Sequence, residues 1–309
     1  MYTEPKFIWM DGEIVEYEKA TVHFLTSALH FGTAVLEGIR CYDTPEGPAI
    51  FRLAEHMERL INSVKILGLH ELPYSREELC EATKQVISAN GFHECYIRPL
   101  AYHACAFPTL VLTNGKTRIG IAAWEFGSYL GDDARELGVC ANVSSFTRHH
   151  PNVMMTKGKI TGNYSNSALA KTDSLQLGFD EAIMLDPQGF VAECTGENLF
   201  LVRKGKIITP PTATVLEGIT RDSLMEVAVD LGFQVIEQPI SRDQLYISDE
   251  IFVCGTAAEC IAIRVIDYRQ IGSGKMGPVT QAIQGAYWAA THGQNPRYAK
   301  WLDYLNLRR

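Results

Sequence analysis

The chain has 309 residues, of which 46% are hydrophobic and 21% charged, the balance of a globular protein long enough for two domains. Its net charge of −8, with no basic stripe, argues against a nucleic-acid partner. No apolar run approaches the ~20 residues of a membrane-spanning helix. The first residues, MYTEPKFIWMDGE, lack the basic and then apolar pattern of a signal peptide.

The eight cysteines indicate a reducing environment. None forms a CxxC pair, and no Cys/His cluster has the spacing of a zinc site. Several, such as Cys254 in EIFVCG, lie inside apolar runs where a thiol behaves as a small hydrophobe. We expect no metal and a cytoplasmic location.

The first half of the chain alternates strands and helices. Strand-like residues 7–15 carry an Asp11-Gly12 hairpin turn. Apolar residues at spacings of three and four predict a helix over 53–67, and a second helix is expected over 76–90, ending at Asn90-Gly91. YIRPLAY (96–102) and TRIGIAAWEF (117–126) have the composition of strands.

Residues 127–138, GSYLGDDARELG, are the best linker candidate, since they combine glycines with charges and have no apolar period. Beyond them we expect strands in VCANVSSF, EAIMLD, GFVAECTGENLFLVRKGKIITP and EIFVCG. Helices are expected over YSNSALAKTDSLQLG, 223–231 and 277–289. The prediction is a mixed α/β (α+β) protein with a small domain over 1–126, an interdomain loop over 127–138 and a larger domain over 139–309.

Lys159 is the first candidate for chemistry. It precedes a glycine-containing turn and then Asn163-Tyr164, which lead into a helix. A lysine that forms a Schiff base needs such a fixed, partly desolvated position. A solvated loop lysine is the plain alternative, and Lys157 competes with it.

Glu193 is the second candidate, at the end of an apolar strand and before Gly196-Glu197-Asn198. A buried carboxylate needs a partner, and a protonated pyridine nitrogen is one that makes pyridoxal phosphate (PLP) an electron sink. The alternative is a solvent-facing carboxylate at a strand end.

Three further segments suit an anion. In LEGITRD (216–222), a glycine and Thr220 stand before the expected helix, where free N–H groups and the helix dipole favour phosphate. Thr220 as a plain helix cap is the alternative. Gly255-Thr256 is a turn of small residues whose N–H groups could meet an anion. Arg59 lies beside the apolar seam of its helix, and an ordinary surface arginine is the alternative.

Taken together, these motifs resemble the fold-type IV PLP enzymes, and within them the branched-chain-amino-acid aminotransferases, over roughly residues 7–300. The stretches that carry the resemblance are HFGTAVLEGIRCY (30–42), EHMERLINSVKILG (55–68), YIRPLAY (96–102), KITGNYSNS (159–167), ECTGENLF (193–200), LEGITRDS (216–223) and CGTAAE (254–259). Lys159 five residues before Tyr164 fits the family's register, and Lys157 does not.

The resemblance implies a role for each residue. Lys159 would hold PLP and move the proton between the substrate Cα and the cofactor. The cofactor would further be bound by Arg59, Tyr164, Glu193, Leu216, Ile219, Thr220 and Thr256. The substrate pocket would be formed by Phe31, Leu36, Gly38, Tyr96, Arg98, Phe126, Tyr129, Thr256 and Ala257. The implied reaction is ping-pong transfer of the amino group of Leu, Ile or Val to 2-oxoglutarate, with PLP and its pyridoxamine form (PMP) alternating.

Two departures bear on the substrate. Similar proteins commonly carry an aromatic residue at the place of Leu36, and a glycine-rich loop where this chain has AYHACAFPTLVL with Pro108. Loop 103–110 is expected to reach the pocket of a partner subunit, so a homodimer is the smallest assembly expected. The alternatives within the fold are a D-amino-acid or (R)-amine aminotransferase and an aminodeoxychorismate lyase. A non-enzymatic PLP-binding protein is the alternative outside it.

Overall fold

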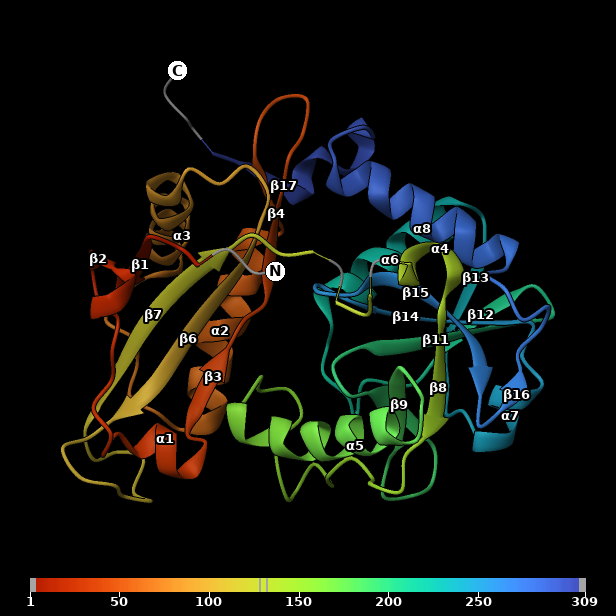
Figure 1. Ribbon diagram of the computed structural model, residues 1–309, viewed down its shortest axis with the longest axis horizontal. Coiled ribbons are helices and arrows are strands. Elements are labelled where there is room, and N and C mark those ends of the chain that lie inside the picture. Colours follow the sequence, from red (N-terminus) through yellow and green to blue (C-terminus); the bar gives the residue numbers. More distant parts are fainter. Residues whose placement is uncertain (1–3, 128, 132, 306–309) are drawn as a thin grey trace. The chain divides into compact units, whose positions relative to one another are not determined.

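The computed structural model describes residues 4–127, 129–131 and 133–305 (Figure 1). By their internal contacts these residues form two compact units. Unit 1 comprises residues 1–126, 157–162 and 289–309, and unit 2 comprises 127–156 and 163–288. Each unit holds one large sheet with helices packed against it, so the expected mixed α/β class is confirmed.

Unit 1 is built on an eight-stranded antiparallel sheet of order β17-β5-β4-β6-β7-β1-β2, with β3 also paired to β6. Its strands are β1 (Phe7–Met10), β2 (Glu13–Glu16), β3 (Ala34–Leu36), β4 (Ile39–Tyr42), β5 (Ala49–Phe51), β6 (Cys95–Ala104), β7 (Lys116–Trp124) and β17 (Leu302–Tyr304). Its helices are α1 (Ser27–Phe31), α2 (Leu53–Leu67) and α3 (Arg76–Asn90), with 3-10 turns η1 (Tyr17–Lys19) and η3 (Pro296–Trp301).

Helices α2 and α3 begin and end where the sequence predicts. Ser75 caps α3 through a reciprocal bond pair with Glu78. Gly68 and Gly91 end the two helices with φ of 81° and 72°, a conformation that glycine adopts without strain. The apolar seam of α2 is buried, with Leu53, Met57 and Leu60 fully enclosed. The Asp11-Gly12 hairpin between β1 and β2 is confirmed.

Unit 2 is built on a nine-stranded mixed sheet of order β10-β9-β8-β15-β14-β11-β12-β13, with β16 beside β15. Its strands are β8 (Val139–Val143), β9 (Glu181–Leu185), β10 (Val191–Cys194), β11 (Asn198–Arg203), β12 (Lys206–Thr209), β13 (Gln234–Glu237), β14 (Glu250–Gly255), β15 (Glu259–Ile266) and β16 (Arg269–Gln270). It also holds α4 (Ala134–Leu137), the short turn η2 (Thr161–Asn163) in part, α5 (Tyr164–Gln176), α6 (Ile219–Asp230), α7 (Arg242–Tyr246) and most of α8 (Pro278–Thr291).

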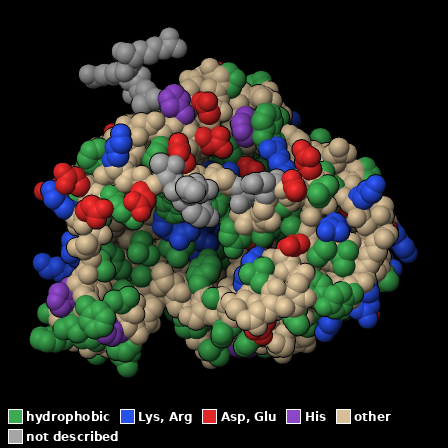
Figure 2. Space-filling model, in the orientation of Figure 1, with side chains coloured by type: hydrophobic (Ala, Val, Ile, Leu, Met, Phe, Trp, Pro, Cys, Tyr) green, Lys and Arg blue, Asp and Glu red, His purple; other side chains and the backbone are tan. Residues whose placement is uncertain are grey.

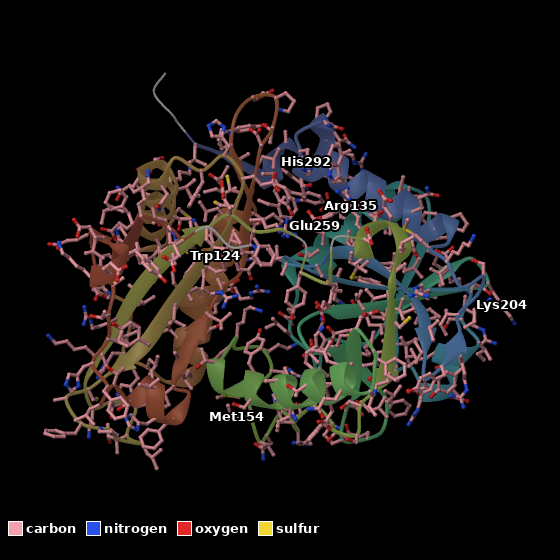
Figure 3. All side chains as sticks on the ribbon, viewed as in Figure 1. Trp124, Arg135, Met154, Lys204, Glu259 and His292 are labelled. Atoms are coloured by element: carbon pink, nitrogen blue, oxygen red, sulfur yellow. The ribbon has the colours of Figure 1, made fainter. Side chains whose placement is uncertain are left out.

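The core of unit 2 is aliphatic and lies between its sheet and its helices. Ile183, Leu199, Leu201, Val253 and Ile266 are among its fully buried members. The Lys204-Gly205 turn joins β11 to β12 with both residues at positive φ, as expected for a two-residue hairpin, and places Lys204 at the tip (Figure 3).

One helix boundary was predicted wrongly. Helix α6 begins at Ile219, four residues before the expected start at Ser223. The sequence rule looked for the first apolar periodic residue, but buried polar side chains fill the first turn, with Thr220, Arg221 and Ser223 each less than 7% exposed. Gly218 is the N-cap, so the interpretation of Thr220 as the helix cap is wrong.

The expected linker contains structure of its own. Within 127–138, residues Ala134–Leu137 form α4, which packs on β15 within unit 2. Residues 157–162 and 289–309 group with unit 1 although they follow the expected boundary. The division into folding domains at 126, 138 and 139 stays a prediction.

No helix in the described part of the chain is long and apolar enough to cross a membrane. Among residues 4–127, 129–131 and 133–305, no group of His, Cys, Asp and Glu has the arrangement of a metal site. Figure 2 shows acidic and basic side chains interspersed on the visible face, with neither sign covering it alone.

Candidate active site

Lys159 lies in unit 1 on a segment that pairs alongside β3. Its backbone N–H donates to Ser63 Oγ at 3.0 Å, and its carbonyl accepts from Leu36 N at 3.0 Å. Val35 and Ile160 form an antiparallel bridge beside it. The lysine is half-buried. Because both backbone groups are bonded to the sheet and to α2, the position of Lys159 is fixed, as a covalent anchor requires.

Arg59 projects from α2 into a buried ion-pair cluster. Its Nε donates to Glu37 Oε1 at 2.7 Å and its Nη2 to Glu37 Oε2 at 2.8 Å, while His56 Nδ1 lies 2.7 Å from the same Oε2. Burial alone would raise the pKa of Glu37, but Arg59 and His56 hold it well below its ordinary value. Burial also lowers the pKa of His56, so the neutral ring donates to Glu37. Arg59 is thus a rigid cation and not the surface arginine of the plain alternative.

Four of the expected substrate residues meet in unit 1. Tyr96 and Arg98 lie on the same face of β6, and Arg98 Nη2 donates to the Tyr96 hydroxyl at 3.1 Å. The rings of Tyr96 and Phe126 are 4.9 Å apart. A Cβ on Gly38 would stand 2.1 Å from the Tyr96 hydroxyl, so only glycine fits there. The structure therefore brings an arginine, a phenol and an apolar ring together.

Leu36 and Phe31 lie on neighbouring elements of unit 1. Leu36 is half-buried in β3, whereas Phe31 is 43% exposed at the end of α1. Strand β6 continues to Ala104, so the expected loop 103–110 begins at Cys105. The loop is tied to α1 by a bond from Thr109 N to Ser27 Oγ at 3.1 Å.

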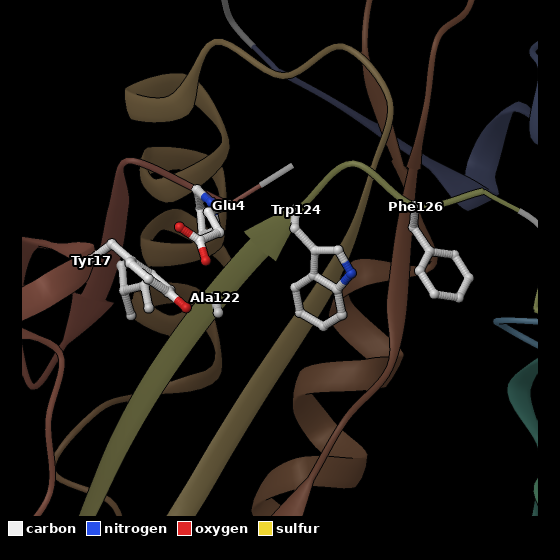
Figure 4. Close-up of a pocket in the computed structure, with 7 residues that line it drawn as sticks. Glu4, Tyr17, Ala122, Trp124 and Phe126 are labelled. Carbon is white, nitrogen blue, oxygen red and sulfur yellow. The ribbon is translucent and has the colours of Figure 1, made fainter. Parts of the chain in front are cut away.

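An apolar pocket of about 440 Å³ opens on unit 1 at the end of β7 (Figure 4). Its lining is Glu4, Pro5, Ile8, Tyr17, Ala122, Trp124 and Phe126. Phe126 is the only expected site residue among them, so the pocket is separate from the chemistry of Lys159.

Glu193 in unit 2 is a buried carboxylate with partners on both oxygens. Its Oε1 lies 2.7 Å from Arg148 Nη2. Its Oε2 accepts from Asn198 Nδ2 and from Leu216 N, both at 3.3 Å. Asn198 also donates to the Leu216 carbonyl at 3.1 Å, which fixes the loop before α6 relative to the carboxylate. The alternative of a solvent-facing Glu193 is wrong.

The first turn of α6 has the geometry that the phosphate-binding prediction requires. No side chain caps the helix at Gly218, and a Cβ on this glycine would lie 2.0 Å from Asn198 Oδ1. Ile219 and Thr220 are buried in the first turn. Backbone N–H groups at the start of a helix carry partial positive charge, which suits a phosphate. Thr256 and Ala257 follow β14 in a half-buried turn of the same unit.

Two tyrosines complete the expected set in unit 2. Tyr164 is the first residue of α5 and is half-buried. Tyr129 is 42% exposed, and the ammonium of Lys171 lies 5.5 Å from its ring centre. Lys171 in turn forms an ion pair with Glu181 at 2.5 Å.

Several buried or half-buried polar residues around these positions were not predicted from the sequence. Burial, reinforced by the Glu181 carboxylate, raises the pKa of Glu197 to about 8. Burial lowers the pKa of His149 to about 4, with Arg148 acting in the same direction. Glu37 and His56 were missed as well. The signal was available for Glu197 and Glu37, since each stands next to a glycine inside a motif, but a sequence does not show which charges are buried together.

The family follows from comparison with known proteins. Residues 34–266 match the family model described as amino-transferase class IV. The chain belongs to this family. Among its relatives within class IV is the branched-chain-amino-acid aminotransferase of Pseudomonas aeruginosa, 45% identical over 294 residues, with 95% of each chain covered. The Escherichia coli K12 protein of the same name is 44% identical over 304 residues, with 97% of each covered.

Solved structures of the same enzyme class share the fold of this class IV chain. A branched-chain amino acid aminotransferase from T.th., with pyridoxamine 5'-phosphate, is 47% identical at a TM-score of 0.95, with 98% of this chain and 99% of that chain covered. The Escherichia coli structure is 42% identical at a TM-score of 0.94, with 98% and 100% covered. The expected fold-type IV architecture is confirmed.

Proposed function

We propose that this chain is a PLP-dependent aminotransferase that exchanges the amino group of L-leucine, L-isoleucine or L-valine with 2-oxoglutarate. The observation that carries the proposal is 44–45% identity to branched-chain-amino-acid aminotransferases over 95–97% of the chain. Lys159 and the Tyr96–Arg98 pair in unit 1, and the buried Glu193 in unit 2, supply residues for that chemistry.

The residues present fit the cofactor. Lys159 has the fixed backbone that a covalent anchor needs, and Glu193 is a buried carboxylate able to pair with a pyridine nitrogen. The phosphate would take the uncapped first turn of α6 at Ile219 and Thr220, with Arg59 and Thr256. Leu216 would pack on the ring, and Tyr164 would donate to its 3-oxygen. When bound, PLP supplies an electron sink for the charge that develops at the substrate Cα.

The chain's own residues move and hold the protons. The Lys159 amine would take the proton from the substrate Cα and deliver it to the cofactor. Glu193 would pair with the ring nitrogen and so favour its protonated form. The amides of Thr256 and Ala257, with Tyr96, bind the substrate carboxylate. These groups are held by backbone structure, so little ordering is needed on binding.

The pocket has to accept an apolar side chain and a charged one in turn. Phe31, Leu36, Gly38, Phe126 and Tyr129 would form its walls. Arg98, whose Nη2 already bonds Tyr96, is the cation that would bind the side-chain carboxylate of glutamate. Leu36 is smaller than an aromatic residue, so we expect tolerance of larger apolar side chains.

A homodimer or larger homo-oligomer is part of the proposal. It is supported by the exposed apolar side chains of the loop that follows β6, where Phe107 is 74% and Leu110 75% exposed. A cytoplasmic location stays a prediction.

The deciding experiment is absorbance of the purified protein between about 300 and 500 nm during addition of L-leucine and then 2-oxoglutarate. We expect L-leucine to abolish the band of the lysine-bound cofactor, and 2-oxoglutarate to restore it. Lys159→Ala should bind PLP weakly and show neither change.

Other outcomes would contradict the proposal in distinct ways. A response to D-amino acids or to amines alone would assign the chain to the D-amino-acid or (R)-amine group. Release of pyruvate from aminodeoxychorismate, without amino-group exchange, would indicate the lyase. No band after addition of PLP would exclude the cofactor.

A further inference from the structure

Arg148 is a buried arginine that none of the proposed roles uses. It lies after β8, and its backbone N–H donates to the Leu185 carbonyl at 2.8 Å. It is 7% exposed, and so is the Glu193 carboxylate that it contacts. Its Nη2 lies 2.7 Å from Glu193 Oε1. A buried guanidinium is costly to desolvate, so its retention beside this one carboxylate points to a role for the pair.

The same guanidinium reaches a second element. Its Nη1 donates to Ser167 Oγ at 3.4 Å. Ser167 lies three residues after Tyr164 on α5, the spacing that puts two side chains on one face of a helix. Arg148 therefore connects the strand of Glu193 to the helix of Tyr164. These are two of the residues proposed to hold the cofactor ring.

The contacts on Glu193 fix the direction of its carboxylate plane. Arg148 holds Oε1 with a short charge-assisted bond, and Asn198 and Leu216 hold Oε2 with longer ones. A cation beside a carboxylate favours its charged form, which is the form that would pair with a protonated pyridine nitrogen.

We infer that Arg148 is a positioning residue for the cofactor ring: it orients Glu193 and keeps it ionised, so that the ring nitrogen stays protonated. The inference rests on the proposed function, since it takes PLP as the group that Glu193 binds. Arg148 itself touches neither substrate nor reacting atoms.

The test is a double-mutant cycle on PLP affinity. Enzyme freed of cofactor is titrated with PLP, and the dissociation constant and the absorption maximum of bound PLP are recorded. Arg148→Met and Glu193→Gln are each expected to weaken binding roughly tenfold to a hundredfold and to shift the absorption maximum. The double variant should bind no more weakly than Glu193→Gln alone, because Arg148 acts through Glu193.

Two further variants separate positioning from general stability. Arg148→Lys keeps the positive charge but lacks the planar guanidinium, so we expect a smaller loss of PLP affinity. This variant also provides the measurement if Arg148→Met does not fold. Arg242→Met removes another arginine–carboxylate pair of 2.7 Å, with Asp267 in the same unit, and should leave PLP affinity and the absorption maximum unchanged.

The outcomes distinguish this inference from the proposed function. Failure of the unaltered protein to bind PLP would overturn the proposed function. The inference is wrong if the unaltered protein binds PLP and both Arg148 variants bind it with the same affinity. It is also wrong if the losses of affinity from Arg148→Met and Glu193→Gln multiply in the double variant, because Arg148 then does not act through Glu193.

Discussion

Three carboxylates buried in unit 2 differ in how their charge is compensated. Glu193 pairs with Arg148, and Glu181 pairs with Lys171 and accepts from Thr195. Glu197 accepts from Gly196 N at 3.1 Å, and its Oε1 has no hydrogen-bond partner among the described residues. Since two cations stand beside three carboxylates, Glu197 is the carboxylate that keeps its proton near neutral pH.

Glu197→Gln should therefore raise stability in alkaline solution. The pKa of Glu197 is about 8 in the folded protein and about 4.3 in an unfolded chain, so folding retains a proton between these values. Stability of the unaltered protein then falls as pH rises through this window, and glutamine removes that fall. We expect the thermal midpoints of the variant and the unaltered protein to coincide near pH 4.5. At pH 9 the midpoint of the variant should be several degrees higher, at about 2–4 °C per kcal/mol of stability.

Glu181→Gln is the matched control, because it leaves the half-buried Lys171 without its carboxylate and should lower the midpoint. A difference between Glu197→Gln and the unaltered protein that does not grow with pH would show that Glu197 is ionised in the folded state.

At the scale of elements, the start of α6 is linked to the Glu193 carboxylate through Asn198. Gly218 places its backbone against Asn198, and Asn198 bonds both Glu193 and the carbonyl of Leu216. The helix start and the Glu193 carboxylate are thus held by one amide side chain. A change at the glycine should affect both.

Gly218→Ala is expected to weaken PLP binding roughly tenfold, because the added Cβ would lie 2.0 Å from Asn198 Oδ1 and would displace this side chain. Overpacking of this kind also costs about 1–3 kcal/mol of stability. Titration with PLP and thermal unfolding measure the two effects. Gly285→Ala in α8, where an added Cβ meets nothing within 4 Å, should leave both unchanged or slightly raise stability. If the two variants bind PLP equally well, Gly218 does not contribute to PLP binding.

At the scale of the whole molecule, exposed apolar side chains gather around α1 and the loop after β6. Phe24 is 73% exposed, Leu29 60%, Phe107 74% and Leu110 75%. The bond from Thr109 to Ser27 ties the loop to the helix. Clustered exposure of this kind marks surfaces that associate, and supports the proposed homo-oligomer.

Sedimentation should give at least twice the chain mass of 34.4 kDa for the unaltered protein. Phe107→Ser with Leu110→Ser should shift the mass toward a single chain, since both lose apolar contact area. Val229→Ser, at an exposed apolar position of α6, should leave the mass unchanged. A single-chain mass for the unaltered protein would contradict the proposed assembly.

Local patterns predicted most of the elements. The positions of α2 and α3 were predicted correctly, because each helix is followed by a glycine stop and α2 has a clear apolar period. Helix α6 was predicted four residues short, because its first turn is buried through polar side chains that carry no apolar period. Helix α4 was predicted as linker, since four residues show no period at all.

The sequence by itself determined the family, through motifs whose residues and spacings are local: Lys159 with Tyr164, Glu193 with Asn198, and Gly218 before Thr220. Only the tertiary structure decided which buried charges neutralise one another. Glu37 meets Arg59 across 22 positions and Arg148 meets Glu193 across 45, pairings that depend on strand register and helix packing. Burial strengthens these pairs, and burial is a property of the fold and not of any short motif.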